Sequence, residues 1–170
     1  MPLTHALMPS PQAEGTLLRC DSELVGVREV AHGRHLVAIR QIPAGTRVLT
    51  LTGRETSVPT RYSVQVGRSL HLDQDCAHDD AELFMRYFWR YLDHHCDPTA
   101  VLRGRELFAL RDIAHGEGVT FDYNTTEYDM AAPFACHCDS VHCVGVVRGA
   151  RHLTPVQRAR RARWIASHLR

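Results

Sequence analysis

Short runs in which apolar and polar residues alternate, separated by turn residues, fill much of the chain between residues 24 and 123. Alternation with a period of two predicts half-buried β-strands, and a glycine or proline between two runs predicts a turn. Turns of this kind are Pro43-Ala44-Gly45, Gly67-Arg68 and His115-Gly116-Glu117-Gly118. The predicted strands are Leu24–Val27, His35–Arg40, Arg47–Leu51, Tyr62–Val66, Ser69–Leu72, Glu106–Arg111 and Val119–Tyr123, with a further extended stretch at Gly145–Gly149.

Two segments have the length and composition of helices. Ala81–Leu92 is rich in leucine, methionine and aromatic residues, and Asp79 or Asp80 can cap its first turn. Thr154–Arg170 begins with Thr154 as the N-cap and a proline at the first helical position. Many short strands with one clear helix among them predict a mostly β domain with a minor α component.

The segment Thr154–Arg170 has two interpretations. It is a lid over a substrate groove or a patch for an acidic partner, or it is a docked helix whose basic face is solvated. Its arginines are Arg158, Arg160, Arg161, Arg163 and Arg170. The apolar positions available as a buried stripe are Val156, Ala159, Ala162, Ile165 and Leu169.

Composition narrows the class of protein. Of 170 residues, 44% are hydrophobic and 23% are charged, which suits one folded domain with short appendages. The net charge of +1 gives no overall indication of nucleic-acid binding. No apolar run approaches the roughly 20 residues of a membrane span, and the residues from Met1 to Gly15 lack the order of a signal peptide. We therefore expect a soluble, cytoplasmic protein with a short irregular lead-in.

All 20 basic residues are arginine, and the chain contains no lysine. A genome rich in G and C explains this bias, and together with the short length it favours a bacterial source. An enzyme of this sequence that modified lysine could not modify itself.

The cysteines are unevenly distributed. Cys20 and Cys76 stand apart, whereas Cys136, Cys138 and Cys143 lie within eight residues in the segment C-H-C-D-S-V-H-C. In a chain with no secretory signal, clustered thiols favour a metal over disulfides. Three thiolates leave a tetrahedral zinc ion one ligand short. The alternatives are reduced cysteines in a loop, or a ligand from His137 or His142.

The segment F-D-Y-N is the second concentration of candidate chemistry. If it lies on a strand, Phe121 and Tyr123 share one face and Asp122 points to the other. Two aromatic residues on one strand face are usually part of a core, so the pattern alone assigns them no chemistry.

Four segments, in this order, resemble the SET-domain family of lysine methyltransferases and together span roughly residues 24 to 150. They are G-R-H-L-V-A-I-R-Q-I-P-A-G-T-R-V-L from Gly33, R-Y-L-D-H-H-C-D-P-T from Arg90, L-F-A-L-R-D-I-A-H-G-E-G-V-T-F-D-Y-N from Leu107 and F-A-C-H-C-D-S-V-H-C from Phe134. The resemblance implies small curved sheets around a threaded core. It divides the chain into a lead-in (1–15), a SET domain (16–131), a zinc-binding post-SET segment (132–150) and a basic C-terminal helix (151–170).

The resemblance also assigns the metal ligands. It supplies Cys96 as the fourth ligand, so that one structural Zn²⁺ would be bound by Cys96, Cys136, Cys138 and Cys143. Four sulfur ligands close a tetrahedral shell, so this ion would not be the catalyst. It would pin a short tail against the domain.

The resemblance makes Tyr123 catalytic, with its hydroxyl beside the transferred methyl group. Phe121 occupies a position where the family has tyrosine or phenylalanine. A phenylalanine there leaves more room around the amine, so we expect more than one methyl group to be added.

The remaining expected residues contact S-adenosylmethionine, which would leave as S-adenosylhomocysteine. They are Gly33, Arg34, His35, Tyr62, Arg90, Asp93, His94, Tyr123 and Phe134. The chain departs from the family where His35 replaces a glycine and Asp93 replaces an asparagine, and a carboxylate cannot donate a hydrogen bond as an amide does. Tyr62 and Phe134 are alternatively plain core residues, and His94 a hydrogen-bonded interior histidine.

The sequence therefore predicts an S-adenosylmethionine-dependent N-methyltransferase that acts on lysine in a protein substrate. No separate domain for docking a protein is recognisable, which keeps a free amino acid or small amine open as the substrate. A SET fold that has lost catalysis and reads a partner is the third interpretation, and His35 and Asp93 favour it. Neither membrane nor nucleic-acid partners are expected.

Overall fold

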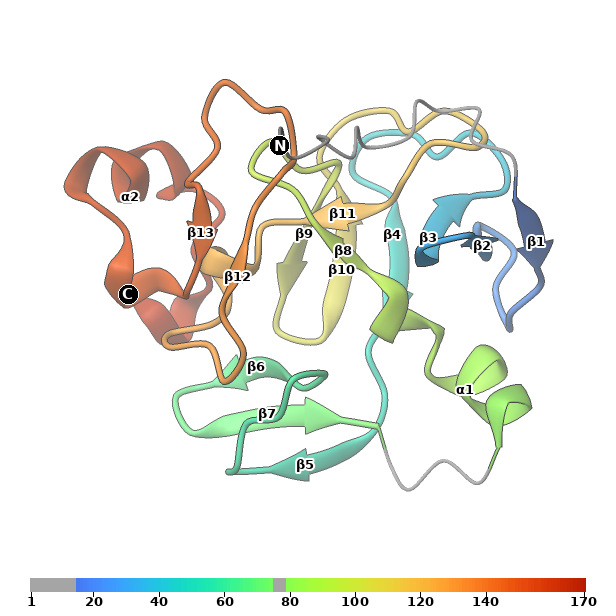
Figure 1. Cartoon of the computed structure of the whole chain (residues 1–170), viewed down its shortest axis with the longest axis horizontal. Coiled ribbons are helices and arrows are strands. Elements are labelled where there is room, and N and C mark those ends of the chain that lie inside the picture. Colours follow the sequence, from blue (N-terminus) through green and yellow to red (C-terminus); the bar gives the residue numbers. More distant parts are fainter. Residues whose placement is uncertain (1–14, 75–78) are drawn as a thin grey trace, which may run out of the picture.

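A computed structural model describes residues 15–74 and 79–170 (Figure 1). The predicted lead-in and Cys76 therefore lie outside the described residues, apart from Gly15. The strands are β1 (Thr16–Leu18), β2 (Val25–Val30), β3 (Gly33–Ala38), β4 (Arg47–Thr50), β5 (Arg54–Thr56), β6 (Val64–Gly67), β7 (Leu70–Asp73), β8 (Asp93–His94), β9 (Ala100–Arg103), β10 (Glu106–Ala109), β11 (Thr120–Phe121), β12 (Phe134–Ala135) and β13 (Val146–Val147). The α-helices are α1 (Asp80–Arg86) and α2 (Pro155–Arg161), and the 3-10 helices are η1 (Phe88–Tyr91), η2 (Tyr123–Thr125), η3 (Ala150–His152) and η4 (Ser167–Leu169).

Within these ranges, the strands pair into small separate sheets. Three sheets have three strands each, in the orders β1-β2-β3, β4-β10-β9 and β5-β7-β6. Two further sheets are the pairs β11-β8 and β12-β13. The predicted hairpin around Gly67-Arg68 is confirmed by the antiparallel pairing of β6 with β7. The mostly β architecture expected from the pattern is confirmed.

The core is formed by buried residues of the sheets β1-β2-β3 and β4-β10-β9 together with residues of β7 and η1. Leu36, Leu102 and Leu107 are fully buried there, although β9, which carries Leu102, was not among the predicted strands. Two isolated bridges, Val37 with Gly118 and Ile42 with Ile113, connect β3 and the turn after it to the segment that leads into β11. This segment is therefore fixed on the core before it reaches the F-D-Y-N residues.

A short parallel pair brings two distant motifs together. Thr120 pairs with Asp93 and Phe121 pairs with His94, so β11 lies beside β8. The backbone N–H of His95 also donates to the Phe121 carbonyl at 3.2 Å. The segments R-Y-L-D-H-H-C and F-D-Y-N thus become neighbours, as Figure 1 shows at the centre of the molecule.

The predicted helix Ala81–Leu92 is interrupted. Helix α1 ends at Arg86, and Tyr87 leaves helical geometry before η1 begins at Phe88. Tyr87, Phe88 and Trp89 are all buried, and an α-helix separates successive side chains too widely to bury three in a row on one side. The cap was predicted correctly, because the Asp79 side chain accepts a hydrogen bond from the Glu82 N–H at 2.8 Å.

The predicted strand Val119–Tyr123 is also shorter than expected. Strand β11 contains only Thr120 and Phe121, and Tyr123 opens the 3-10 helix η2. The reason is the Asp122 side chain, which accepts from the Asn124 N–H at 3.0 Å and caps the turn. Phe121 and Tyr123 are therefore not two residues on one strand face, although their ring centroids lie 4.7 Å apart.

The predicted C-terminal helix Thr154–Arg170 ends at Arg161. Its start is as expected, with a capping box between Thr154 and Gln157. After Arg161 the chain turns back, and the Ala166 N–H donates to the Thr125 carbonyl at 2.8 Å. This return contact beside η2 shows why one straight helix would not fit.

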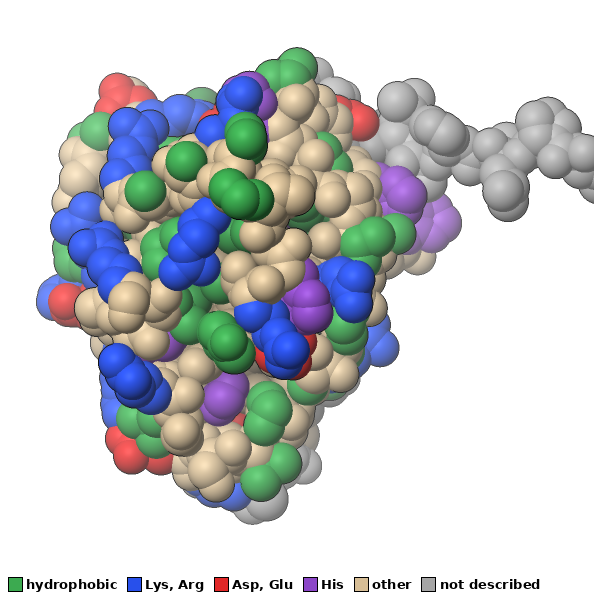
Figure 2. Space-filling model, turned by 90° about the vertical axis from the view of Figure 1, so that its left-hand side faces the viewer, with side chains coloured by type: hydrophobic (Ala, Val, Ile, Leu, Met, Phe, Trp, Pro, Cys, Tyr) green, Lys and Arg blue, Asp and Glu red, His purple; other side chains and the backbone are tan. Residues whose placement is uncertain are grey.

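The predicted faces of this segment are partly wrong. Val156, Ala159 and Ala162 are exposed, so only Ile165 and Leu169 of the expected stripe are buried. Arg161, expected on a solvated face, is 1% exposed. Figure 2 shows arginine side chains on this side of the molecule interspersed with hydrophobic and other side chains. Every helix in the described ranges is too short or too polar to cross a bilayer.

Candidate active site

One cavity collects the residues expected to carry chemistry. Its volume is about 1020 Å³, and its wall comes from the start of β3, residues 60–64, the end of η1 with β8, the F-D-Y-N turn and residues 130–138. Every residue expected to contact the cofactor lines this cavity: Gly33, Arg34, His35, Tyr62, Arg90, Asp93, His94, Tyr123 and Phe134. Phe121 lines it as well, and so does Glu127, which the sequence did not single out.

Tyr123 is held in this wall through both its backbone and its phenol. Its N–H donates to His94 Nδ1 at 3.1 Å, and its hydroxyl donates to the Leu92 carbonyl. The rings of Phe121, His94 and Phe134 surround it, with centroids 4.7, 5.3 and 6.0 Å away. Burial, with smaller contributions from the nearby carboxylates of Asp93 and Glu127, raises the pKa of Tyr123 well above its usual range. The phenol therefore stays protonated, fixed in direction and able to act as a neutral polar group.

His94 is both a cavity residue and a hydrogen-bonded interior histidine, so the two interpretations coincide. Nδ1 accepts from Tyr123, which places the ring proton on Nε2, and Nε2 lies 3.2 Å from Cys96 Sγ. Burial lowers the pKa of His94 to about 4, although Asp122 lies nearby. The neutral ring thus connects the catalytic candidate Tyr123 with a cysteine of the cluster.

The two departures from the family pattern form a pair. His35 Nδ1 and Asp93 Oδ2 lie 2.7 Å apart across strands β3 and β8, and each side chain is about one-third exposed, at 33% and 36%. The hydrogen bond that His35 donates to the Asp93 carboxylate raises the pKa of His35. The backbone at His35 has no positive φ, because Asp139 is the non-glycine residue with a positive φ in the described ranges. A glycine is therefore not required at position 35. A histidine and an aspartate replace the residues usual in the family at these two positions. Their opposite charges could have indicated in the sequence that the two side chains pair.

Aromatic and arginine side chains form the rim of the cavity. Tyr62 is 48% exposed and Phe134 is 38% exposed, so neither is a plain core residue. The Arg90 guanidinium stacks 4.4 Å from the centroid of the Tyr62 ring. Arg34 pairs with Glu29 at 2.8 Å. The rim therefore offers flat faces and cationic groups to a bound molecule.

A buried ion pair fixes the F-D-Y-N turn from behind. Arg161 Nε donates to Asp122 Oδ2, and both side chains are at most 2% exposed. Asp122 Oδ1 accepts from the N–H and the side-chain amide of Asn124 at 3.0 and 2.9 Å. This role of Arg161 was not predicted, because Arg161 is one of several arginines in the same helix.

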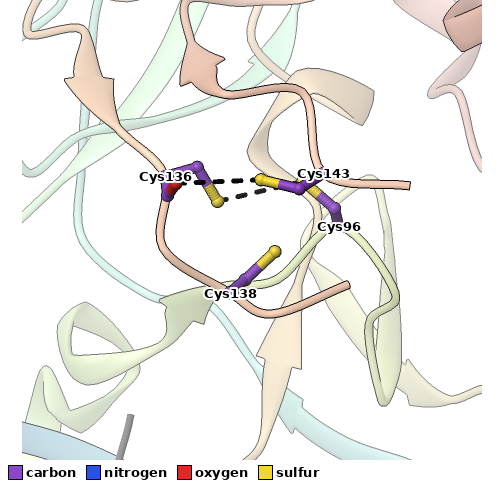
Figure 3. A group of neighbouring side chains, drawn as sticks. All are labelled: Cys96, Cys136, Cys138 and Cys143. Carbon is purple, nitrogen blue, oxygen red and sulfur yellow. Dashed lines mark hydrogen bonds between the residues drawn. The ribbon is translucent and has the colours of Figure 1, made fainter. Parts of the chain in front are cut away.

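The four cysteines assigned to a metal come together. Their Sγ atoms all lie within 4.8 Å of one another, and Cys96 and Cys136 are separated by 3.9 Å. Figure 3 shows Cys96 approaching from the segment after β8 and the other three from the tail, with their sulfurs turned toward one another. The group contains neither His137 nor His142, and the His142 ring instead accepts from Arg160 at 2.8 Å.

The donor set fits a zinc ion. A tetrahedral ion with sulfur ligands at about 2.3 Å places those sulfurs about 3.8 Å apart, close to the spacing of this cluster. Burial raises the pKa of Cys96 to about 12, so the protein alone does not stabilise a thiolate at Cys96. A bound cation would favour the thiolate forms. The arrangement is compatible with a post-SET zinc site.

Comparisons with known proteins agree with this geometry. A family model described as "SET domain" matches residues 33–124. This chain belongs to the SET-domain family. Its matched segment begins at Gly33 in the wall of the cavity and ends in η2, so it contains most of the candidate site.

The matched relatives of this SET domain are methyltransferases. The "Methyltransferase flvH" of Aspergillus flavus is 30% identical over 148 residues, which is 82% of this chain and 72% of that protein. The "Histone-lysine N-methyltransferase, H3 lysine-36 specific" of Candida glabrata is 38% identical over 35% of this chain. The human "Histone-lysine N-methyltransferase 2B" is 29% identical over 75% of this chain. The alignments span only 9% and 5% of the length of these two histone enzymes.

Solved SET-domain structures share the fold. KRYPTONITE, solved with mCHH DNA, an H3(1-15) peptide and SAH, superposes with a TM-score of 0.51 at 22% identity over 71% of this chain and 29% of that chain. The methyltransferase domain of human SETMAR gives a TM-score of 0.52 at 16% identity over 71% and 56% of the two chains. These similarities confirm the expected SET fold.

Proposed function

We propose that this chain transfers methyl groups from S-adenosylmethionine to the amine of a lysine side chain in a protein. The observation that carries the proposal is that one cavity contains every expected cofactor residue together with Tyr123 and Phe121. Its volume of about 1020 Å³ is large enough for the cofactor and a lysine side chain together. The histone-lysine enzymes among the relatives support lysine as the acceptor.

The residues present fit the cofactor. The backbone at Gly33–His35 and the paired side chains of His35 and Asp93 would hold its methionine end, because together they offer both acceptors and a cationic donor. Phe134 and Tyr62, exposed on the rim, would pack against flat parts of the molecule. When bound, S-adenosylmethionine supplies a methyl group on a positively charged sulfur.

The side chains of the cavity have three tasks in the reaction. They must exclude water, align the amine with the methyl group, and favour the neutral amine, because only its lone pair attacks. A free lysine with a pKa of about 10.4 is neutral in only about one of a few thousand molecules at pH 7. An apolar channel lowers that pKa. Tyr123, immobilised by Leu92 and His94, would orient the amine.

Phe121 would set the degree of methylation. It is 3% exposed, and its ring packs 4.7 Å from that of Tyr123 without contributing a hydroxyl. A hydroxyl at this position would hold the amine or a water molecule and leave less space. We therefore infer that the enzyme adds more than one methyl group, and mass spectrometry at exhaustive turnover tests this. Only monomethylated product would contradict it.

We also infer that Cys96, Cys136, Cys138 and Cys143 bind one structural Zn²⁺. The four converging thiols support this inference. The ion would fasten the tail that carries Phe134 and thereby complete the cavity wall.

A small amine is the second candidate for the substrate. The fungal relative that aligns with 82% of this chain is described only as a methyltransferase, with no histone in its name. A non-catalytic binding module is a third possibility, and the unusual residues His35 and Asp93 were the features that suggested it. Their mutual pairing in the cavity is consistent with a working cofactor site instead.

One experiment separates these alternatives. The purified chain is incubated with radiolabelled S-adenosylmethionine and a cell lysate, and protein is then separated from small molecules. Label on lysine in the protein fraction supports the proposal, and label in the small-molecule fraction supports the second candidate. Calorimetry that detects no binding of S-adenosylmethionine would exclude both forms of catalysis. Because the chain contains no lysine, labelled lysine cannot come from the enzyme itself.

A further inference from the structure

Three carboxylates line the cavity, and they differ in their partners. Glu29 is paired with Arg34 at 2.8 Å, and Asp93 is paired with His35 at 2.7 Å. Glu127 has no arginine within salt-bridge distance in the described part of the chain. Among these three carboxylates, Glu127 is therefore the one available to bind a cation that enters the cavity.

The surroundings of Glu127 hold its carboxylate in place without neutralising it. Its side chain is 10% exposed, and Oε1 accepts from the Gln65 N–H at 2.7 Å. Oε2 lies 4.0 Å from His71 Nε2, too far for a hydrogen bond. Burial, with a contribution from His168, lowers the pKa of His71, so this neighbour is neutral at physiological pH.

Glu127 lies on the same turn as Tyr123 and lines the same cavity. It follows Tyr123 by one turn, and its N–H donates to the Tyr123 carbonyl at 2.9 Å. The charge of Glu127 also contributes to the raised pKa of the Tyr123 phenol. An amine oriented by Tyr123 would therefore enter the field of this carboxylate.

We propose that Glu127 is the residue that receives the substrate amine: it binds the ammonium group and accepts one of its protons before methyl transfer. This inference rests on the proposed function. The N–H bond of the ammonium breaks, its electron pair stays on nitrogen, and the proton moves to a Glu127 oxygen. The neutral amine then forms a bond to the methyl carbon as the carbon–sulfur bond breaks, and Glu127 later releases the proton to solvent.

The ionisation of Glu127 suits this role. Burial raises its pKa to about 7, although the hydrogen bond from Gln65 acts in the opposite direction. A base with a pKa near the working pH is both available and effective. The other titratable groups near it are His71 on β7, His168 on η4, which acts on His71, and Tyr123 on η2. His71 is neutral at physiological pH and the Tyr123 phenol stays protonated, so a bound ammonium is the expected counter-charge.

The first test measures binding of n-butylamine, a mimic of the lysine side chain, to the protein saturated with S-adenosylhomocysteine. Calorimetry is performed at pH 6 and pH 8.5, where this amine is protonated. The wild type should bind more tightly at pH 8.5, because Glu127 is then ionised. Glu127→Gln should lose at least about 10-fold in affinity at pH 8.5 and lose the pH dependence. Equal affinities for the two proteins would overturn the proposal.

The second test measures methyl transfer to poly-L-lysine as a function of pH. Glu127→Gln keeps an oxygen that can accept from Gln65, so the turn should be preserved. We expect kcat/KM to fall at least about 10-fold at pH 8, with loss of the ionisation near pH 7 from the profile and partial rescue by Glu127→Asp. Glu55→Gln, on exposed β5, is the matched control and should behave as the wild type.

Thermal unfolding without ligands distinguishes this role from a structural one. Glu127 is neutral in the folded protein below pH 5, and ionisation above pH 7 places a charge in a buried site. Glu127→Gln removes that charge, so its Tm should equal that of the wild type at pH 5 and exceed it at pH 8. A lower Tm at both pH values would assign a structural role and refute the proposal.

Failure of the proposed methyl transfer can be distinguished from failure of the proposed role of Glu127. If the wild type labels neither protein nor small molecules in the lysate, no methyl transfer exists for Glu127 to assist. Wild-type transfer with unchanged binding and kinetics in Glu127→Gln refutes only the role of Glu127.

Discussion

The cysteine cluster and the Arg161–Asp122 pair fasten the same turn in different ways. The cluster reaches Tyr123 from one side through Cys96 and His94, and the ion pair holds Asp122, the residue just before Tyr123, from the other. Three of the four cysteines were visible as a group in the sequence by their spacing, and the family resemblance added Cys96. The ion pair was not visible in this way, because burial alone distinguishes Arg161 from the other arginines of α2. Groups that need an external ion leave a pattern, whereas groups that satisfy each other do not.

Removal of the proposed zinc ion should have the largest effect. The buried thiols would lose the ion proposed to order the tail, so chelation or Cys136→Ser should lower the free energy of unfolding by at least about 5 kcal/mol and Tm by about 10–20 °C. Metal analysis and calorimetry measure this, and methyl transfer should be lost with the metal. Cys20→Ser is the matched control, since Cys20 is buried but lies outside the cluster. A metal-free protein with the wild-type Tm would show that the cysteine cluster does not stabilise this turn through a metal ion.

Loss of Arg161 should come next. Arg161→Met leaves Asp122 buried without its cation, which costs about 3–5 kcal/mol. Urea denaturation should detect this, and the double variant Arg161→Met with Asp122→Asn should recover part of the loss. Arg160→Met, on the same helix but exposed, should stay within about 0.5 kcal/mol of the wild type. If Arg161→Met and Arg160→Met lower the free energy of unfolding equally, burial of Arg161 does not determine its contribution to stability.

Tyr123→Phe tests the phenol that the cysteine cluster and the Arg161–Asp122 pair both help to position. The hydroxyl that donates to Leu92 disappears while the ring remains, so turnover should fall at least about 10-fold, or about 1.4 kcal/mol of activation free energy. Binding of S-adenosylmethionine, measured by calorimetry, should be nearly unchanged. Wild-type turnover in this variant would remove Tyr123 from its role.

The His35–Asp93 pair should show the smallest effect, since its side chains are about one-third exposed, at 33% and 36%. The raised pKa of His35 means that its contribution to stability is complete below the ordinary value of 6.5 and is lost as pH rises through the raised value. Asp93→Asn should therefore cost about 0.5–1 kcal/mol at pH 5.5 and almost nothing at pH 9. Unfolding at the two pH values measures the difference. A larger cost at pH 9 would reverse the assigned sign.

The sequence predicted most strands of the three larger sheets, the hairpin and the helix caps, because each depends on local pattern, but β1, β5 and β9 were not foreseen. The grouping of Cys96 with the three tail cysteines came from the family resemblance, because Cys96 lies 40 residues before Cys136. The prediction failed where tertiary contacts decide. Tyr87, Phe88 and Trp89 all turn inward and break the predicted helix, and the Asp122 side chain ends β11 early. Glu127 and Arg161 were missed because a single charged residue resembles a surface residue until its surroundings are known. His35 and Asp93 were both noticed as unusual, and only the fold shows that they meet.

The parallel pairing of β8 with β11 affects how the protein folds during its synthesis. Asp93–His94 and Thr120–Phe121 contact each other only after the intervening hairpin has closed a long loop, and such distant pairings form slowly. A nascent chain or fragment that stops before Thr120 therefore lacks the F-D-Y-N side of the cavity. Methyl transfer should appear only after the chain beyond Thr120, including residues 130–138 of the cavity wall, has been synthesised.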